Sequence, residues 1–170
     1  MAHAMPIPPR RPRGLTLLEL MIGLAVLALV ASLALPSFAG VAGRTRLKQV
    51  AETLAADIAE ARFDAARRGQ PVHVEFQGGP QWCWAVASTP GCSCGAPQSC
   101  QLKTVQARDH GGVVLVQAAA VQLQGSGGVT AASQVLFQSA QGEQLRVDVS
   151  PLGRAVVCAP GGAVPGYMAC

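Results

Sequence analysis

The N-terminal part of the chain carries one long apolar run. Nearly every residue from 15 to 35 is apolar, and as a helix this stretch would span about 31 Å, close to the hydrocarbon thickness of a bilayer. Glu19 interrupts the run near its start, and a carboxylate in a membrane usually marks a function and a partner. The apolar region of a secretory signal is shorter, at about 7–15 residues. The pattern therefore predicts a membrane-spanning helix over 15–36.

A second helical pattern follows without a proline over 37–68, where apolar residues recur every three or four positions. This stripe consists of Phe38, Val41, Leu47, Val50, Leu54, Ile58, Ala61 and Ala65. We expect the charged residues to lie mainly on the other faces; they are Glu52, Asp57, Glu60, Asp64 and Arg67. Pro36 should bend or locally melt the helix where it leaves the membrane. Gly69 and Pro71 should end it, so we predict an amphipathic helix over 37–69 that packs on a head domain.

After Gly69 the pattern changes to short extended runs separated by Gly, Pro and Ser. The runs that we predict as strands are 72–77, 82–88, 101–107, 113–118, 121–124, 134–138 and 144–149. In the last of these, apolar and polar residues alternate, so one face should be core and the other solvated. The fold class that we predict is α+β, with a long N-terminal helix followed by a β-sandwich-like, all-β head over 70–170.

Composition and charge narrow the class of protein. Half of the chain is hydrophobic and only 13% is charged, which excludes a disordered protein. A protein with several membrane spans is also excluded, because only one uncharged run is long enough to cross a bilayer. The net charge of +4 includes Arg10, Arg11 and Arg13, and from residue 70 onward four basic residues face four acidic ones. Any affinity for nucleic acid must therefore come from a local patch.

Six cysteines lie in the C-terminal half of the chain, which suits an oxidising compartment such as the periplasm. They allow 15 complete pairings. Disulfides are favoured over a metal cluster for Cys83, Cys92, Cys94 and Cys100, because zinc sites more often use two C-x-x-C pairs. We expect Cys158 and Cys170 to close the Gly- and Pro-rich terminal segment, which would stabilise it by about 3 kcal/mol.

The sequence offers no recognisable catalytic constellation. We expect His73 at a surface or sheet edge, and His110 in a turn before two glycines. Neither histidine belongs to a zinc or nucleophile motif, and there is no phosphate-binding glycine loop. We therefore predict a protein that is not an enzyme and that uses no cofactor or metal.

The start of the apolar run resembles a known processing signal. Gly14-Leu15-Thr16-Leu17-Leu18-Glu19-Leu20-Met21-Ile22 is similar to the type III signal of type IV pilins and type II secretion pseudopilins, with Leu15 where that family usually has Phe. The resemblance implies that a prepilin peptidase removes the leader, residues 1–14, after Gly14, and that Leu15 is then N-methylated. It also implies that Glu19 pairs with the terminal amine of a neighbouring subunit during filament assembly. A buried carboxylate needs a buried cation, and a new α-amine provides one.

The C-terminal part resembles the GspH/FimT type of minor pilin or pseudopilin, whose chain ends with a Gly-Arg-containing hairpin. Here that end contains Pro151, Gly153 and Arg154, and the spacing suits a turn that places Arg154 at the base of the next strand. In FimT-like pilins of natural transformation a Gly-Arg-x-Arg element is associated with DNA. Val156 occupies the second Arg position, so Arg154 and Arg146 predict at most weak, strongly salt-sensitive contact with DNA. The alternative for Arg154 is a solvated turn residue or an ion pair with Asp148.

These observations together predict a minor pilin in the bacterial inner membrane, with a single span and a periplasmic head. Its expected partners are other pilins, contacted through the N-terminal helix, and the prepilin peptidase. The first interpretation is a subunit that primes the assembly of a type IV pilus. The alternatives are a type II secretion pseudopilin acting in protein secretion and a DNA-binding receptor subunit for natural transformation.

Overall fold

The computed structural model describes the backbone of residues 16–170 and the side chains of residues 16–32 and 40–170. The chain divides into two compact units, Met1–Phe38 and Ala39–Cys170, and helix α1 contributes to both. The predicted leader, with Gly14 and Leu15 at its cleavage point, lies outside the described residues.

Helix α1 comprises Leu17–Arg68. Thr16 caps its start, because the Thr16 Oγ1 accepts a hydrogen bond from the Glu19 N–H at 3.2 Å. The predicted end is confirmed, since Gly69 has a φ of +64°, a left-handed conformation that favours glycine. Helix α1 continues through Pro36, but the structure does not describe the side chain of Pro36. The predicted bend at Pro36 stays a prediction.

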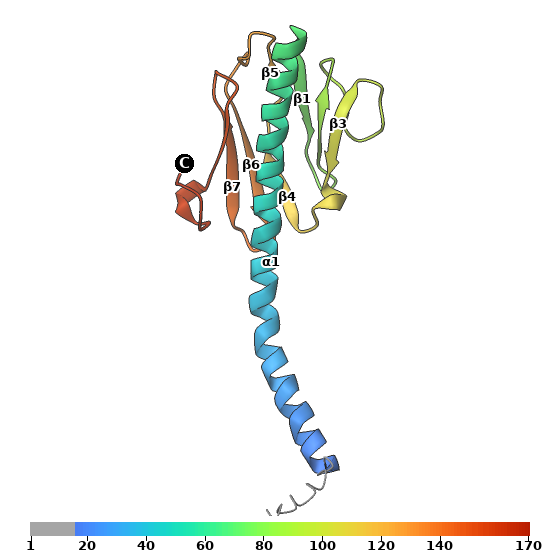
Figure 1. Ribbon diagram of the computed structural model, residues 1–170, viewed down its shortest axis with the longest axis vertical. Coiled ribbons are helices and arrows are strands. Elements are labelled where there is room, and N and C mark those ends of the chain that lie inside the picture. Colours follow the sequence, from blue (N-terminus) through green and yellow to red (C-terminus); the bar gives the residue numbers. More distant parts are fainter. Residues whose placement is uncertain (1–15) are drawn as a thin grey trace, which may run out of the picture. The chain divides into compact units, whose positions relative to one another are not determined.

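Two antiparallel sheets of four strands form the head (Figure 1). The first sheet has the strand order β3-β2-β1-β5, and the second has the order β4-β6-β7-β8. The strands of the first sheet are β1 (Val72–Gln77), β2 (Cys83–Ala87), β3 (Gln101–Gln106) and β5 (Val121–Leu123). The strands of the second are β4 (Val113–Gln117), β6 (Ser133–Ser139), β7 (Gln144–Val149) and β8 (Ala155–Cys158). Short 3-10 turns, η1 (Ala107–Asp109) and η2 (Pro160–Gly162), follow β3 and β8.

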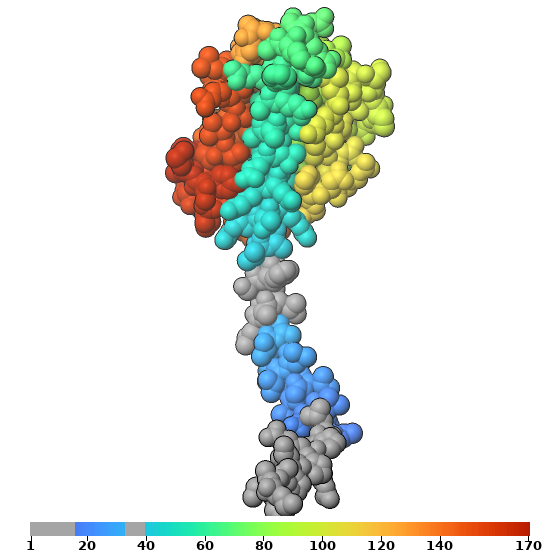
Figure 2. All heavy atoms as spheres, viewed as in Figure 1, coloured from blue at the N-terminus to red at the C-terminus, as the bar shows by residue number. Residues whose placement is uncertain are grey.

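One core joins the helix to both sheets. Figures 1 and 2 show the part of α1 in the head unit lying over the two sheets, with β7 on one side and β3 on the other. The helix contributes the predicted stripe from Leu47 to Ala65, all at most 2% exposed, whereas Val41 is exposed. At the centre, Trp82 and Trp84 stack with ring centroids 5.7 Å apart, and Phe137 of the second sheet packs against both rings.

All seven predicted strands are present, and each of their ends lies within one residue of the prediction. The predicted hairpin at the C-terminal end is also confirmed. The Gly153 N–H donates to the Ser150 carbonyl at 2.8 Å, which closes a turn with Pro151 in its second position, and β8 begins directly after Arg154.

Two residue placements expected from the sequence are wrong. Asp57 is only 2% exposed, because Trp84 and Lys103 reach it from the first sheet and satisfy its carboxylate. His73 is only 6% exposed, because β1 is a central strand: β2 and β5 pair on its two sides and place Ala87 and Gln122 beside His73. His110 does lie in a turn, after η1, where its ring stacks on Trp82.

Candidate functional site

The N-terminal part of α1 exposes an apolar surface. Ten large apolar side chains are each at least 55% exposed: Leu17, Leu18, Leu20, Met21, Ile22, Leu24, Val26, Leu27, Leu29 and Val30. They occupy every face of the helix, and a helix that is hydrophobic all round is normally buried in a large protein or in a membrane. The isolated chain therefore carries a surface that requires a covering partner.

Glu19 lies in the first turn of this helix, on an exposed surface. Its backbone N–H is the one capped by Thr16, so Thr16 and Glu19 have the spacing of a capping box. A carboxylate in the first turn also faces the positive end of the helix dipole. Glu19 thus has a local role at the helix start, and its side chain remains accessible to a cation from outside the chain.

Within the described part of the chain, no helical stretch has the length and apolarity needed to cross a membrane.

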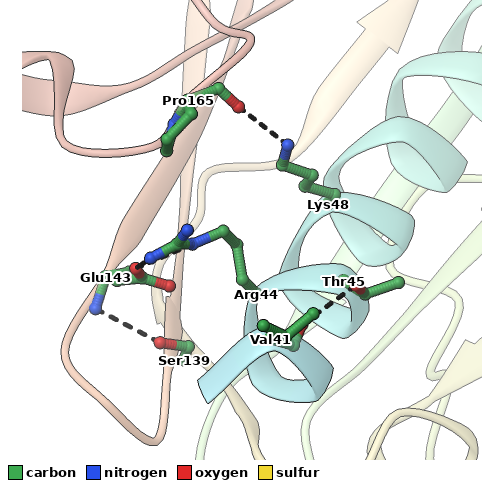
Figure 3. Close-up of polar contacts among 7 residues, drawn as sticks. All are labelled: Val41, Arg44, Thr45, Lys48, Ser139, Glu143 and Pro165. Atoms are coloured by element: carbon green, nitrogen blue, oxygen red, sulfur yellow. Dashed lines mark hydrogen bonds and ion pairs between the residues drawn. The ribbon is translucent and has the colours of Figure 1, made fainter. Parts of the chain in front are cut away.

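Within the head unit, three basic residues of α1, Arg44, Arg46 and Lys48, bind the loops that pack around the helix. Figure 3 shows Arg44 reaching Glu143 in the β6–β7 turn and Lys48 reaching the Pro165 carbonyl in the C-terminal segment. Arg44 donates to the Glu143 Oε1 from Nε at 2.9 Å, and this hydrogen bond and the carboxylate charge raise the pKa of Arg44. Arg46 donates to the Gly111 carbonyl at 3.1 Å. The three cations therefore join α1 to three different loops.

An ion pair between a buried aspartate and a half-exposed lysine joins the middle of α1 to the first sheet. Asp57 accepts hydrogen bonds from Trp84 Nε1 at 2.9 Å and from Lys103 Nζ at 2.5 Å. The hydrogen bond to Asp57 is the main cause of a raised pKa at Lys103, and desolvation of the ammonium opposes it. This group positions the helix on the sheet, and each carboxylate oxygen of Asp57 accepts a hydrogen bond from it.

The two arginines proposed for DNA contact lie in different environments. Arg146 is on β7 and pairs with Asp148 two residues along the same strand, with Nε and Oδ1 2.8 Å apart. Arg154 is exposed after the β7–β8 turn, and among the described residues its side chain has no ion-pair partner. Arg146 lies beside Cys158, at the opposite end of β8 from Arg154, so the two charges do not form one site. Of the two expected alternatives for Arg154, the pair with Asp148 is not formed, and the exposed side chain fits a solvated turn residue.

The cysteines form three disulfides, and the prediction of disulfides in place of a metal cluster is confirmed. Cys83 pairs with Cys94, Cys92 with Cys100, and the predicted Cys158–Cys170 bridge closes the C-terminal segment. The first two bridges overlap along the chain and fix the β2–β3 loop over the outer face of the first sheet, where Cys94 is buried against Ala85. Asp148, Cys158 and Cys170 come close together, but both thiols are consumed by the bridge and cannot bind a metal as thiolates.

A further group near the C-terminal end of α1 was not expected from the sequence. Arg62 donates from Nε to the Gly127 carbonyl at 2.7 Å, and the neighbouring Phe63 is 69% exposed. Both side chains line a hollow with Ala59, Ala66 and Ser126. No motif marks Arg62, but the Gly127 loop that it contacts belongs to the stretch of 111–142, whose lack of charged residues is visible in the sequence.

A helix with an exposed apolar N-terminal part and a head built of two antiparallel sheets defines a pilin-like protein. Two models of known protein families match the sequence. The prokaryotic N-terminal methylation motif matches residues 9–35, and the model of the type II transport protein GspH matches residues 50–153. Because this second match covers more than half of the chain, the chain belongs to the family of the type II transport protein GspH.

Two solved structures of one type IV minor pilin are similar to the chain in fold. Two crystal forms of the type IV minor pilin FimU of Pseudomonas aeruginosa are each 14% identical to the chain, with TM-scores of 0.51 and 0.54. They match over 71% and 73% of this chain and over 98% and 96% of their own. The minor pseudopilin EpsH from the type 2 secretion system of Vibrio cholerae is 17% identical, with 68% of this chain and 98% of EpsH covered and a TM-score of 0.49. No curated protein sequence matches the chain significantly.

Proposed function

We propose that this chain is a structural subunit of an envelope filament, made as a precursor and assembled through its N-terminal helix. The prepilin peptidase would cleave after Gly14, and methylation would follow at Leu15. The filament that we favour is a type IV pilus, in which a low-abundance subunit of this kind primes assembly. Other pilins are then its direct partners.

The exposed apolar surface of α1 between Leu17 and Val30 carries this proposal. Before assembly, lipid can cover this surface, and in a filament the helices of neighbouring subunits can replace the lipid. Glu19 then needs a cation in the same apolar surroundings, and the terminal amine of a neighbouring subunit meets this need.

The proposed location is the inner membrane, with residues 15–36 as a single span and the head in the periplasm. The three disulfides support the periplasmic side for the head, because disulfides persist in oxidising compartments.

Mass spectrometry of the mature N-terminus tests the processing step. The full chain, purified from its host membranes, should begin at Leu15 and carry one methyl group on the α-amine. A Gly14→Ala variant is the matched control and should retain residues 1–14. A wild-type chain that begins at Met1, or at a residue of the apolar run after Leu15, would contradict the proposal.

A type II secretion pseudopilin is the alternative with the same architecture. Deletion of the gene separates the two roles: loss of surface pili with normal export of folded proteins supports the pilus, and the converse supports the secretion system. Complementation with the full chain should restore whichever process is lost.

Contact with DNA, as in an uptake receptor, stays a prediction of the Gly153-Arg154 pair. The exposed side chain of Arg154 makes it the better candidate, since Arg146 is already paired with Asp148. The full chain in detergent, titrated with a labelled oligonucleotide at low and moderate salt, should lose binding in Arg154→Ala and keep it in Arg146→Ala. Absence of binding by the wild-type chain at low salt would remove this role.

A further inference from the structure

Three segments meet at the C-terminal end of α1 and fix one another. The Gly127 carbonyl accepts the hydrogen bond from Arg62, and the Val129 N–H donates to the Pro151 carbonyl at 3.1 Å. Gly153, with a φ of +70°, lies so close that a Cβ there would be 3.0 Å from the Gly127 oxygen and 3.1 Å from the Arg62 Cδ. The end of the helix, the 124–129 loop and the β7–β8 turn therefore form one ordered surface.

This surface, which we call the Arg62 rim, consists of Arg62, Phe63, Leu152 and Arg154. Phe63 is 69% exposed and shares the hollow with Arg62 and Gly127, while Leu152 is 68% exposed at the tip of the turn that contacts them. Among the aromatic side chains that the structure describes, only that of Phe63 is largely exposed. Figure 2 shows the end of α1, in green, beside the orange 124–129 region on the outside of the head.

The two arginines of the rim carry uncompensated charge. None of the ion pairs among the described residues involves Arg62 or Arg154, and Arg62 is bonded only to a neutral carbonyl. The helical neighbours of Arg62 at three and four positions are Ile58, Ala59, Ala65 and Ala66, none of them acidic. The loop that faces Arg62 belongs to the uncharged stretch of 111–142. A carboxylate is therefore the group that this surface lacks.

We propose that the Arg62 rim binds a neighbouring pilin subunit through a partner segment that presents apolar side chains beside a carboxylate. This inference rests on the proposed function and adds a second contact, made by the head, to the one made by the N-terminal helix. The composition fits a protein partner, because interface centres are enriched in aromatic residues and Arg and depleted in Lys, Asp and Glu. Because the surface is ordered in advance, little conformational entropy is lost on binding.

A protein partner fits this surface better than a nucleic acid does. Binding to a phosphate backbone depends on many cations in a row, and the rim supplies two. Half of the rim is apolar. Leu152 in particular contributes no binding free energy through contact with a phosphate, whereas its burial against an apolar side chain of a protein partner would stabilise the complex.

Site-specific photocrosslinking of the full chain in its host cells tests the proposal. p-Benzoylphenylalanine is placed at position 63, at position 24 in the apolar part of α1, or at position 114 on the exposed outer face of β4 as a control. Position 63 should give a covalent adduct with another pilin subunit, identified by mass spectrometry. The double variant Arg62→Gln/Arg154→Gln should lower its yield at least fivefold, and Arg62→Lys/Arg154→Lys should restore most of it. The adduct at position 24 should be unchanged in both.

Glutamine at position 62 keeps an N–H donor for the Gly127 carbonyl, so this variant removes charge without removing that contact. Equal amounts of disulfide-bonded protein on non-reducing gels show that the variants fold. If position 24 gives a pilin adduct and position 63 gives none, or gives one with DNA, the rim proposal is wrong and the proposed function stands. An adduct at position 63 that is insensitive to the glutamine variants also overturns it. If neither position reaches a pilin, the proposed function itself is wrong.

Discussion

At the scale of single residues, Asp57 shows where a local pattern is overridden by tertiary contacts. Helical spacing places it beside the apolar stripe, and its charge suggested a solvated face. The indole N–H of Trp84 and the ammonium of Lys103, 27 and 46 residues away in sequence, make its burial favourable instead. The partners of Asp57 cannot be predicted from the sequence of the helix alone, because they depend on which strands pack against the helix.

Replacement of Asp57 tests this contact. Asp57→Ala should lower the free energy of unfolding by about 2 kcal/mol or more, because it leaves the buried Trp84 N–H without an acceptor. Asp57→Asn keeps an acceptor for Trp84 and should cost less. Urea denaturation of the full chain in detergent, followed by tryptophan fluorescence, measures both. Equal losses in the two variants would mean that the charge pair with Lys103 matters and the indole contact does not.

Tyr167 gives a direct test of the C-terminal contact with α1. It is the only tyrosine of the sequence, and burial together with a hydrogen bond to Glu52 raises its pKa from 10.0 to about 12. Because the folded pKa is above the unfolded one, the stabilisation is complete below about pH 10 and is lost as the pH rises towards 12. Absorbance at 295 nm should show one titration with a pKa near 12. The Glu52→Gln variant should lower this pKa but keep it above 10.0, because Tyr167 remains buried. A wild-type midpoint of 10 in the folded protein would contradict the contact.

Gly153 is a position where both backbone angle and space require glycine. Gly153→Ala should lower the free energy of unfolding by about 2 kcal/mol, since it adds left-handed strain to a close contact with Gly127 and Arg62. Gly111→Ala is the matched control, because a Cβ there meets nothing within 4 Å. Thermal unfolding of both variants measures the difference, and similar melting temperatures would argue against the close packing of the turn.

At the scale of elements, most of the fold could be predicted from the sequence. The three- and four-residue spacing from Leu47 to Ala65 gave the helix, and glycine- and proline-bounded runs gave the strands. The pairing of the strands into two sheets could not be predicted in this way. The burial of His73 shows the consequence, because a three-residue strand far along the chain, β5, turns β1 into a central strand.

The Cys158–Cys170 bridge was predictable because a Gly- and Pro-rich segment cannot order itself well. In the structure it also holds the C-terminal segment along β8, where Ala159 and Ala169 form an isolated bridge. The double variant Cys158→Ser/Cys170→Ser should lower the free energy of unfolding by about 3 kcal/mol. It should also shift the titration of Tyr167 towards 10, as the segment leaves α1. An unchanged titration would show that Lys48 and Glu52 hold the segment without the bridge.

At the scale of the whole molecule, each of the two units carries a different surface for contact with partners. The N-terminal unit has an apolar helix with Glu19 in its first turn. The head is a disulfide-bonded domain with the Arg62 rim on its surface. The processing signal could be recognised from residues 14–22 alone, because the carboxylate is out of place in an apolar run. The rim could not, because Arg62 and Arg154 are 92 positions apart in the sequence.

The most direct measurement of the central claim is the amount of the chain in purified surface filaments from host cells that express Glu19→Ala in place of the wild type. The account predicts that the variant is cleaved after Gly14 and remains in the membrane fraction, but falls at least tenfold in the filaments, while Glu19→Asp keeps part of the incorporation. Incorporation of Glu19→Ala at the wild-type level would contradict assembly through a buried carboxylate–amine pair.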